Sequence, residues 1–377
     1  MQNIVSYFSY HEFKESSDLF FNNRSITYSG VGNSSSKALI ISNILCSVAR
    51  KGVGLGCILW VTNDEAEMER IKKSLSVWGD TPVFSYRPVT EDDRGEYALT
   101  SEYNREKQLR AVEFVSQMAT MRSSKNSSDA IDDGGRPGHS AIFVVPFNAV
   151  FQKFPNGEDL KKRSLKLRVD LEADVVAFIE SIVDRGYDNA DDEYVRKGQY
   201  FKIGDSVVLW PVNKDEVYRI QFGFDKIEKI NSYQVEEKKE LISKKTLEIY
   251  PVDYGMESES ILREIGENGV VIDDELDVAD DFYENWNVFM EEASKTVRTV
   301  SFTSFNEDEN THLHMHFYSV LKYRTGYDFT NDLRDKIMGG WKVLIFTKAV
   351  LDVGALLDDQ SIPYRDKLPK DGFESDA

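Results

Sequence analysis

The amino-acid sequence predicts an α/β protein whose strand–helix pattern is interrupted by a block of antiparallel hairpins. Residues 24–79 alternate strands and helices around a glycine-rich turn. Residues 186–251 instead hold short β-rich runs broken by Gly, Pro and Asn/Asp, with no helix between them, which is typical of antiparallel hairpins. After Pro251 the strand–helix alternation returns. This order predicts one α/β lobe into which a smaller antiparallel domain is inserted.

The composition indicates a folded protein with an acidic surface. The chain has 377 residues, which suits two or three domains, and 41% of them are hydrophobic. There are 65 acidic and 46 basic residues, so the formal net charge is −19. Because nucleic-acid grooves need clustered cations, this charge predicts no strong direct contact with nucleic acid. It favours a protein partner with basic patches, or solubility alone.

The cysteine content and the absence of long apolar runs predict the cellular compartment of the protein. Cys46 and Cys57 are the two cysteines, and their apolar surroundings favour free thiols in a reducing compartment over a disulfide. The N-terminus carries no basic leader, and no apolar run is long enough to span a bilayer. We therefore expect a soluble, cytoplasmic protein without a membrane contact.

The first lobe has five recognisable elements. In order, we expect a strand, a glycine-rich turn, a helix, a buried strand and an amphipathic helix at residues 24–28, 30–37, 38–48, 56–61 and 64–78. Met68, Ile71 and Leu75 recur at helical spacing, so they predict the buried face of the second helix.

The glycine-rich turn lies where a phosphate-binding loop would lie, but its residues depart from that loop. A working loop reads G-x-x-x-x-G-K-[ST], in which the last hydroxyl holds magnesium. With Lys37 in the lysine position, Val31 and Ser36 replace the two glycines and Ala38 replaces the hydroxyl residue. Gly32, Ser36 and Lys37 are therefore predicted to form a degenerate loop without ATP hydrolysis, although helix N–H groups could still attract an anion. We expect no bound cofactor.

The chain then completes the lobe and enters the insertion. A helix at residues 105–121, a Ser/Asp/Gly-rich linker at 123–140 and a buried strand at 141–146 lead to a helix at 171–184. The hairpin block follows, with strands predicted at residues 201–210, 218–222, 225–230 and 247–251. Gly198 and Gly204 stand where the backbone is expected to bend or to adopt positive φ.

The remaining residues predict the end of the lobe and a small last unit. A short helix at 260–265 precedes a strand at 269–275, which ends in Asp273, Asp274 and Glu275, and an aromatic-rich helix. In the last unit, strands are expected at residues 299–302, 312–317 and 341–346, with helices at 329–338 and 349–357. The predicted domains are therefore a discontinuous lobe, an insertion, a small α/β domain and a flexible tail, at residues 1–150 with 250–297, 151–249, 298–366 and 367–377.

Two sets of side chains are candidate binding residues. The first set is basic and lies in the hairpin block, where it could face a carboxylate-rich partner or be ordinary solvated strand ends: Arg196, Lys197, Lys202 and Arg219. The second set, His312, His314 and His316, alternates along a strand and so shares one face. Because no cysteine or carboxylate follows at zinc-site spacing, we expect an exposed strand face and no metal site.

The hairpin block also resembles a known domain. A Gly-Tyr pair at Gly186, a Gly-Gln-Tyr-Phe strand start at Gly198, a Gly-Asp turn at Gly204, a strand ending at Pro211 and a Tyr-Arg-Ile-Gln-Phe strand at Tyr218 follow one another. This series, over roughly 65 residues, resembles the UvrA-interaction domain shared by the excision-repair protein UvrB and the transcription-repair coupling factor Mfd. The family has an arginine before the glycine of the turn, where this chain has Ile203. Lys202, one place earlier, is expected on the opposite face of the strand.

The degenerate loop extends the resemblance to the N-terminal, UvrB-homologous region of Mfd. UvrB keeps an intact phosphate loop, whereas a Gly-Ser-Ser-Lys-Ala type of loop is similar to the first domain of Mfd. The resemblance implies a degenerate RecA/helicase-like lobe, an inserted α+β interaction domain and a small C-terminal α/β domain. It also implies that basic residues near the turn hold UvrA.

The function implied by this resemblance is that of a non-catalytic adaptor. Such a protein would recruit UvrA in transcription-coupled nucleotide excision repair, with RNA polymerase or a separately encoded translocase as an indirect partner. The alternative is a UvrB-like or helicase-like ATP-dependent repair enzyme that uses Lys37 with Asp273, Asp274 and Glu275. A third reading is an interaction protein that keeps the fold without a repair role.

Overall fold

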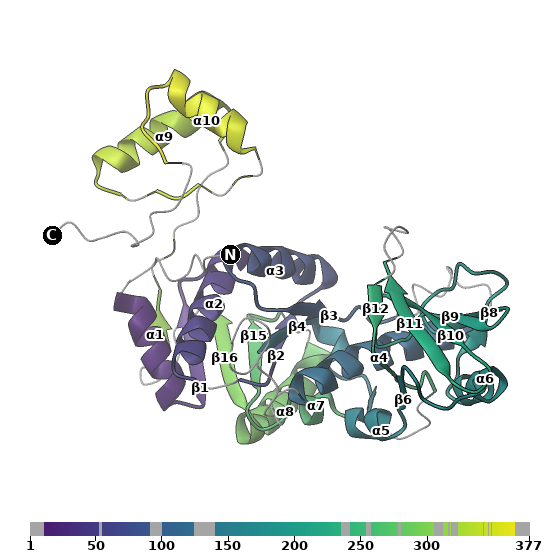
Figure 1. Ribbon diagram of the computed structural model, residues 1–377. Helices are drawn as coiled ribbons and strands as arrows, with labels where there is room; N and C mark the ends of the chain where they lie inside the picture. The colour runs from purple at the N-terminus through teal and green to yellow at the C-terminus, as the bar shows by residue number, and fades with distance from the viewer. Residues whose placement is uncertain are drawn as a thin grey trace.

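The computed structural model is a mixed α/β protein with one parallel and one largely antiparallel sheet (Figure 1). It describes residues 11–52, 55–90, 100–123, 140–234, 242–253, 258–277, 280–304, 312–315, 317, 323–341, 343–345, 347 and 349–365. The predicted linker at 123–140 and the predicted tail at 367–377 lie almost entirely or entirely outside these residues. Over the part of the chain that is described, no helix combines the length and the apolar character needed to cross a bilayer.

The larger sheet has seven parallel strands in the order β17-β1-β16-β15-β2-β4-β3. In chain order they are β1 (Ser25–Ser29), β2 (Cys57–Thr62), β3 (Val83–Ser85), β4 (Ala141–Pro146), β15 (Val270–Asp274), β16 (Arg298–Thr303) and β17 (His312–His314). All residues of β2 and β4 are buried, as expected for central strands of a parallel sheet.

Helices cover both faces of this sheet, because the side chains of a strand alternate between its two faces. On one face, Ile58 and Trp60 pack beneath α1 (His11–Asn22), α2 (Ser34–Arg50) and α3 (Glu65–Trp78). On the other, Leu59 and Val61 pack beneath α4 (Thr100–Ser123), α7 (Ile261–Ile265) and α8 (Asp280–Thr296). The predicted apolar face of α3 is confirmed, since Met68, Ile71 and Leu75 are its buried residues.

The inserted hairpins form a separate six-stranded sheet in the order β12-β11-β10-β9-β8-β7. Its strands are β7 (Asp188–Asn189), β8 (Gln199–Ile203), β9 (Ser206–Leu209), β10 (Val217–Phe222), β11 (Ile227–Tyr233) and β12 (Ile242–Lys244). All neighbours are antiparallel except β7 and β8. The strand predicted at 201–210 is in fact a hairpin of β8 and β9. Its turn contains Gly204 at φ +56°, and Gly198 has φ +81°, so the prediction for both glycines is confirmed.

Two short ribbons and two helices complete the insertion. β5 (Phe154–Pro155) pairs with β14 (Ser258–Glu259), and β6 (Leu165–Arg168) pairs with β13 (Thr246–Ile249). The predicted strand at 247–251 therefore belongs to a ribbon and not to the six-stranded sheet. The helices are α5 (Gly157–Lys162), which precedes β6, and α6 (Val175–Val183).

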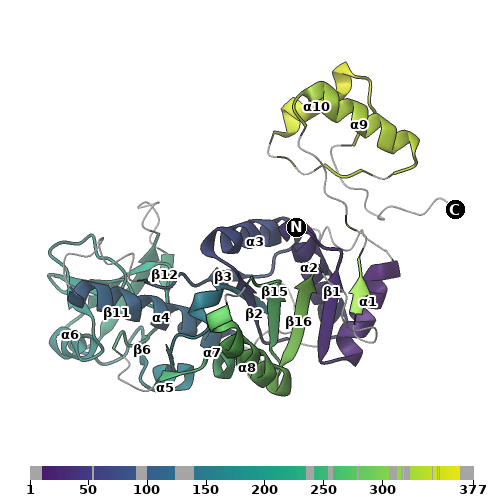
Figure 2. The ribbon, with the colours of Figure 1, turned by 180° about the vertical axis from the view of Figure 1, so that it is seen from behind.

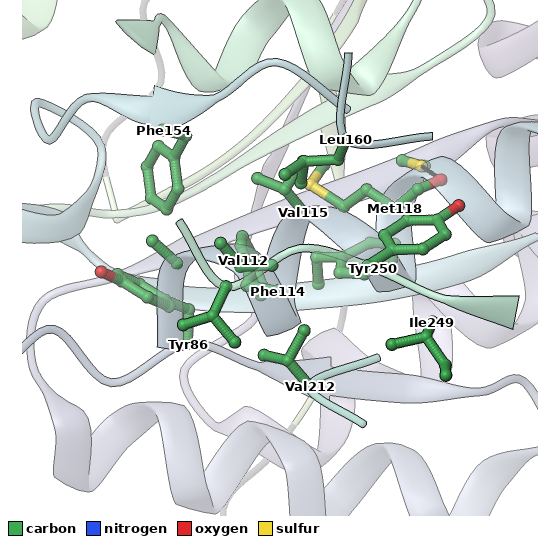
Figure 3. Close-up of a cluster of buried hydrophobic side chains, with 14 of the residues drawn as sticks. Tyr86, Val112, Phe114, Val115, Met118, Phe154, Leu160, Val212, Ile249 and Tyr250 are labelled. Carbon is green, nitrogen blue, oxygen red and sulfur yellow. Dashed lines mark hydrogen bonds between the residues drawn. The ribbon is translucent and has the colours of Figure 1, made fainter. Parts of the chain in front are cut away.

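Helix α4 joins the two sheets through one continuous apolar core. Val112, Phe114 and Val115 of this helix lie between Phe154 on one side and Val212 on the other (Figure 3). The same cluster of buried side chains reaches from Phe143 of β4 in the parallel sheet to Ile220 of β10 in the six-stranded sheet. The two sheets therefore do not have independent cores.

The C-terminal residues differ from the unit expected at 298–366. β16 lies inside the parallel sheet between β15 and β1, and β17 pairs with the other edge of β1. The described residues of the predicted strand at 341–346 are not in a strand, and Trp341 is 61% exposed. A local strand pattern predicts an extended backbone but not which strand lies beside it. The sequence alone could therefore not assign these strands to a sheet.

What remains of the expected last unit is a pair of helices. α9 (Gly326–Met338) and α10 (Val350–Asp359) share a small core of Leu333, Leu357 and Ile362, and the pair stands away from both sheets in Figures 1 and 2.

Candidate functional site

The degenerate loop connects β1 to α2, as the sequence predicts, and its helix start is already capped. Asn33 is the N-cap of α2, and its side-chain oxygen accepts a hydrogen bond from the N–H of Ser36 at 2.9 Å. The N–H of Lys37 donates to the Asn33 carbonyl at 3.1 Å. Because these donors are satisfied inside the loop, they are not directed at an anion as in a phosphate-binding loop.

The side chain of Lys37 is held in a buried ion pair. Its Nζ donates to Oδ1 of Asp274, at the end of β15, and the two residues are 6% and 1% exposed. The second carboxylate oxygen, Oδ2, accepts a hydrogen bond from Nε1 of Trp60 at 3.0 Å. The charge of Lys37 is therefore neutralised by Asp274 in this structure. The sequence alone did not indicate Trp60 as a member of this cluster.

The three carboxylates at the end of β15 do not converge. Asp274 points to the face that carries α2, and Asp273, one residue earlier, points to the face that carries α8, where Trp286 hydrogen-bonds to it. Glu275 has a positive φ of 49° and accepts a hydrogen bond from the N–H of Ser304 at 2.7 Å. The set required by the ATP-dependent alternative is thus divided between two faces of the sheet.

Burial raises the pKa of Asp273 to about 6, from an ordinary value of 3.8. Its Oδ1 is buried without a hydrogen-bond partner among the described residues, and the neighbouring Asp274 carboxylate raises the pKa further. Asp273 therefore takes up a proton in the folded protein at a pH where the unfolded chain has already lost it.

This pKa predicts that stability falls as the pH rises from about 4 to about 7. The folded state binds the proton more tightly than the unfolded state in that window, so Asp273 stabilises the fold below its unfolded pKa and loses this contribution through its folded pKa. A shift of roughly two pKa units corresponds to about 3 kcal/mol. Asp273→Asn should remove this component, which urea unfolding of both proteins across the window will measure. If the difference in unfolding free energy between them is constant with pH, the assignment is wrong.

The histidines of β17 lie next to the loop and contact Ser29. The Oγ of Ser29 is 2.6 Å from Nε2 of His312 and 2.8 Å from Nδ1 of His314. These two side chains share a face, as predicted, while His316 lies outside the described residues. Across the described part of the chain, no three His, Cys, Asp or Glu side chains are grouped closely enough to hold a metal ion.

The four basic candidates are not brought together on one surface. Arg196 and Arg219 are exposed, but Lys197 is 2.5 Å from Oε1 of Glu113 on α4 and 3.4 Å from Oδ1 of Asp215. Lys197 therefore ties the insertion to α4. Lys202 is exposed on the other face of the six-stranded sheet from Arg219.

Strand pairing shows this separation directly. Phe201 and Arg219 both lie opposite Val208, so these three residues share one face of the sheet. Lys202 lies opposite Val207, whose side chain is in the core, and Ile203 returns to the face of Arg219. Ile203 is thus an apolar, half-buried side chain on the same face as Arg219, where it lies opposite Ser206.

Acidic residues also lie close to Arg219. Residues 191–193 (Asp-Asp-Glu) are exposed, and Ala190 and Val195 on either side of them are buried against Val208 and Val217. The pKa of Tyr233 is raised by burial and by Glu193, and lowered by Arg219, so both charges lie near its hydroxyl. This face of the sheet is therefore mixed in charge.

Arg105 of α4 fixes the position of this face, a role that the sequence did not indicate. Its guanidinium donates to the carbonyls of Gly186 and Gly198 at 2.9 and 3.1 Å, and it forms an ion pair with Asp188 at 2.6 Å. The segment between the two glycines is thus attached to α4 at both ends.

A comparison with protein families gives a match that covers the insertion. Residues 165–254 match the family model described as the UvrB interaction domain. A search of the curated proteins found no match. The matched residues begin at β6 and contain the whole six-stranded sheet, but neither Lys37 nor Asp274. We conclude that the inserted part of this chain is similar to the UvrB interaction domain.

Proposed function

We propose that this protein is a non-catalytic adaptor that binds a UvrA-like protein in nucleotide excision repair. The observation that carries the proposal is the match of residues 165–254 to the UvrB interaction domain. The finer assignment, to a module resembling the N-terminal region of Mfd that acts in transcription-coupled repair, rests on the degenerate loop. In this proposal RNA polymerase, or a separately encoded translocase, is an indirect partner.

The absence of catalysis is part of the proposal, and the buried Lys37–Asp274 ion pair supports it. Freeing Lys37 for a nucleotide would leave the Asp274 carboxylate buried without its cation. Isothermal titration of the protein with Mg-ATP should therefore give no binding in the micromolar range, and DNA should stimulate no ATPase activity. Micromolar binding or DNA-stimulated hydrolysis would favour the UvrB-like or helicase-like alternative.

The partner contact is assigned to the exposed guanidinium groups of Arg196 and Arg219. Exposed charges at the edge of an interface act mainly on the association rate, and salt screens them over a Debye length of roughly 10 Å at 0.1 M. Arg196→Glu/Arg219→Glu should therefore slow association with UvrA by an order of magnitude or more, and high salt should reduce the difference. Surface plasmon resonance against UvrA at two salt concentrations measures both effects.

The control carries the same charge change in the other lobe. Lys14→Glu/Lys73→Glu alters two exposed lysines on α1 and α3, which cover the parallel sheet, and should leave the association rate within a factor of about two. Circular dichroism checks that both variants fold. If the wild-type protein does not bind UvrA, the adaptor proposal fails and the interaction protein without a repair role is favoured. If it binds equally well after both reversals, the two arginines are not the contact.

A further inference from the structure

The densest cluster of positive charge in the described chain lies on α5 and β6, away from Arg196 and Arg219. Between residues 157 and 168 the sequence has five basic and two acidic residues, in a protein whose net charge is −19. We define the basic strip as Lys162, Arg163, Lys166 and Arg168, which are all exposed. The side chains of Lys162 and Lys166 are 72% and 71% exposed.

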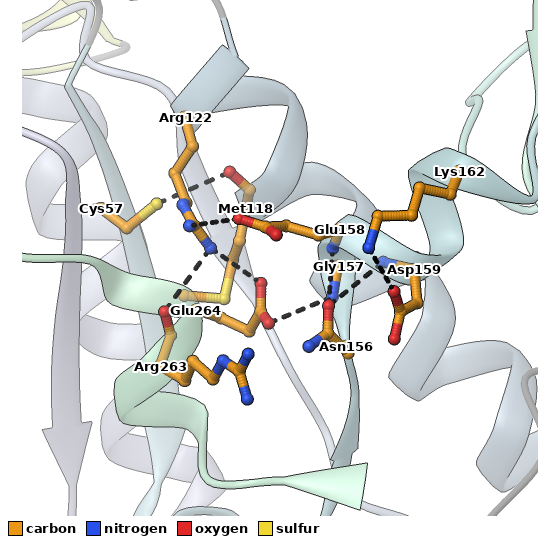
Figure 4. A network of polar contacts seen from close by, with 10 residues as sticks. All are labelled: Cys57, Met118, Arg122, Asn156, Gly157, Glu158, Asp159, Lys162, Arg263 and Glu264. Carbon is orange, nitrogen blue, oxygen red and sulfur yellow. Dashed lines mark hydrogen bonds and ion pairs between the residues drawn. The ribbon is translucent and has the colours of Figure 1, made fainter. Parts of the chain in front are cut away.

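The strip has a fixed geometry because its supports are buried. Asn156 caps α5 through hydrogen bonds to the N–H groups of Glu158 and Asp159 at 2.9 and 3.1 Å. The carboxylate of Glu264, which is 2% exposed, accepts from the N–H of Gly157 at 3.1 Å and from Arg122 of α4 at 3.2 Å (Figure 4). The start of α5 is thus bound to α7 and α4.

The ribbon of β6 and β13 sets the spacing of the last two cations. Leu167 pairs with Leu247 on the buried face, so Lys166 and Arg168 share the exposed face. Residues two apart on a strand are separated by about 7 Å. Two cations at this separation can contact separate phosphates of one nucleic-acid strand.

The carboxylates near the strip are each matched by a cation, and cations remain. Asp159 pairs with Lys162 at 2.9 Å, Glu158 with Arg122 at 3.7 Å, and Glu248 with Lys166 at 3.8 Å. Arg163 and Arg168 form no ion pair with the described residues. Arg185 adds a flanking charge, since its Nε donates to the Arg163 carbonyl at 3.1 Å.

The strip lacks the apolar contacts that protein interfaces use. None of the large hydrophobic side chains exposed among the described residues falls between residues 157 and 170. Protein–protein contacts depend on buried aromatic or aliphatic anchors, whereas binding to a phosphate backbone needs only positioned cations. From this surface we infer that the chain contacts the phosphate backbone of nucleic acid through the basic strip.

The overall acidity of the chain does not oppose this local contact at moderate salt. Charges farther away than a Debye length, roughly 10 Å at 0.1 M, are screened, so the local field is set by the strip, in which Arg163 and Arg168 are not offset by a paired carboxylate of the described residues. The sequence-based expectation of no strong contact followed from the net charge, which does not report local clusters. The contact is a weak, sequence-independent one, of the kind that salt removes readily.

The test uses the full chain alone, without UvrA, so its outcome is independent of the adaptor proposal. Fluorescence anisotropy with a labelled duplex of about 30 base pairs should give a dissociation constant on the order of 10⁻⁵ M at low salt. Each phosphate contact should add about −0.9 to the slope of log K against log salt, so four contacts give a slope between about −3 and −4. Lys162→Gln/Arg163→Gln/Lys166→Gln/Arg168→Gln should weaken binding at least tenfold and remove most of the slope.

A matched variant distinguishes an effect of the basic strip on DNA binding from an effect of the net charge. Lys14→Gln/Lys73→Gln/Arg196→Gln/Arg219→Gln removes the same number of exposed cations elsewhere and should bind DNA as the wild type does. Circular dichroism checks that the strip variant folds as the wild type does. Equal DNA affinity of the two variants, no binding by the wild type, or equally tight binding to poly-glutamate would each overturn the inference.

Discussion

Replacing Lys37 with methionine should lower the free energy of unfolding by about 3–5 kcal/mol, because the Asp274 carboxylate would stay buried with only Trp60 as a donor. This is the loss of stability expected when one partner of a buried ion pair is removed and the other stays buried. Urea unfolding at neutral pH measures it. The control is Lys73→Met on α3, where the lysine is exposed, and it should change stability by no more than about 0.5 kcal/mol.

The double variant Lys37→Met/Asp274→Asn distinguishes a structural ion pair from a nucleotide site. The asparagine carries no charge and its oxygen can still accept from Trp60, so most of the lost stability should return. If Lys37 instead served a bound phosphate, removing Lys37 or Asp274 would lower the free energy of unfolding only when a nucleotide is bound. Should Lys37→Met prove as stable as the wild type, the ion pair would contribute little, and the structural argument against ATP binding would lose its support.

Phe114→Ala is expected to cost a similar amount, about 3–5 kcal/mol, and to weaken both sheets together. The ring of Phe114 is 2% exposed and lies 5.5 Å from the ring of Phe143 in β4 and 5.9 Å from that of Phe154 in β5. Its helix, α4, belongs to the one core that spans both sheets, so removing the ring creates a cavity in that shared core.

Fluorine NMR of fluorotryptophan-labelled protein can follow this unfolding in each sheet separately. Trp60 reports on the parallel sheet and Trp210 on the hairpin block, and both signals should disappear at one lowered urea concentration. Tyr283→Ala, an exposed aromatic residue on α8, is the control and should leave the midpoint nearly unchanged. Two separate transitions would show that the sheets unfold independently and that α4 does not couple them.

Local sequence patterns predicted most elements because they report which side of an element is buried. The spacing of Met68, Ile71 and Leu75 gave the buried face of α3, and Gly198 and Gly204 have the positive φ that was expected of them. The strand predicted at residues 299–302 is β16 (Arg298–Thr303), but its place beside β1 was not predicted. Pairing between parallel strands depends on residues far apart in the sequence, and no local pattern encodes it.

The candidate site was predictable in part for the same reason. The departures at Ser36 and Ala38 indicated a degenerate loop, yet Lys37 and Asp274 are separated by 237 residues, and no local signal paired them. The period of two in a strand did imply that Asp273 and Asp274 face opposite ways. The five basic residues between 157 and 168 are evident in the sequence, but the prediction of no strong nucleic-acid contact used only the net charge of the whole chain.

The place of β1 in the parallel sheet fixes the order in which the protein can be completed during synthesis. Among the described strands, β1 comes first along the chain, whereas its two neighbours, β16 and β17, come last. Ser25 and Thr299, which share a hydrogen bond at 2.8 Å, are 274 residues apart. The hairpins, whose partners are close in sequence, can pair earlier and faster. Until residues 298–314 leave the ribosome, β1 therefore has two open edges, and open edges invite wrong pairing. A nascent chain would thus carry a complete hairpin sheet next to an unfinished parallel sheet, and the late step of its folding would be the arrival of β16.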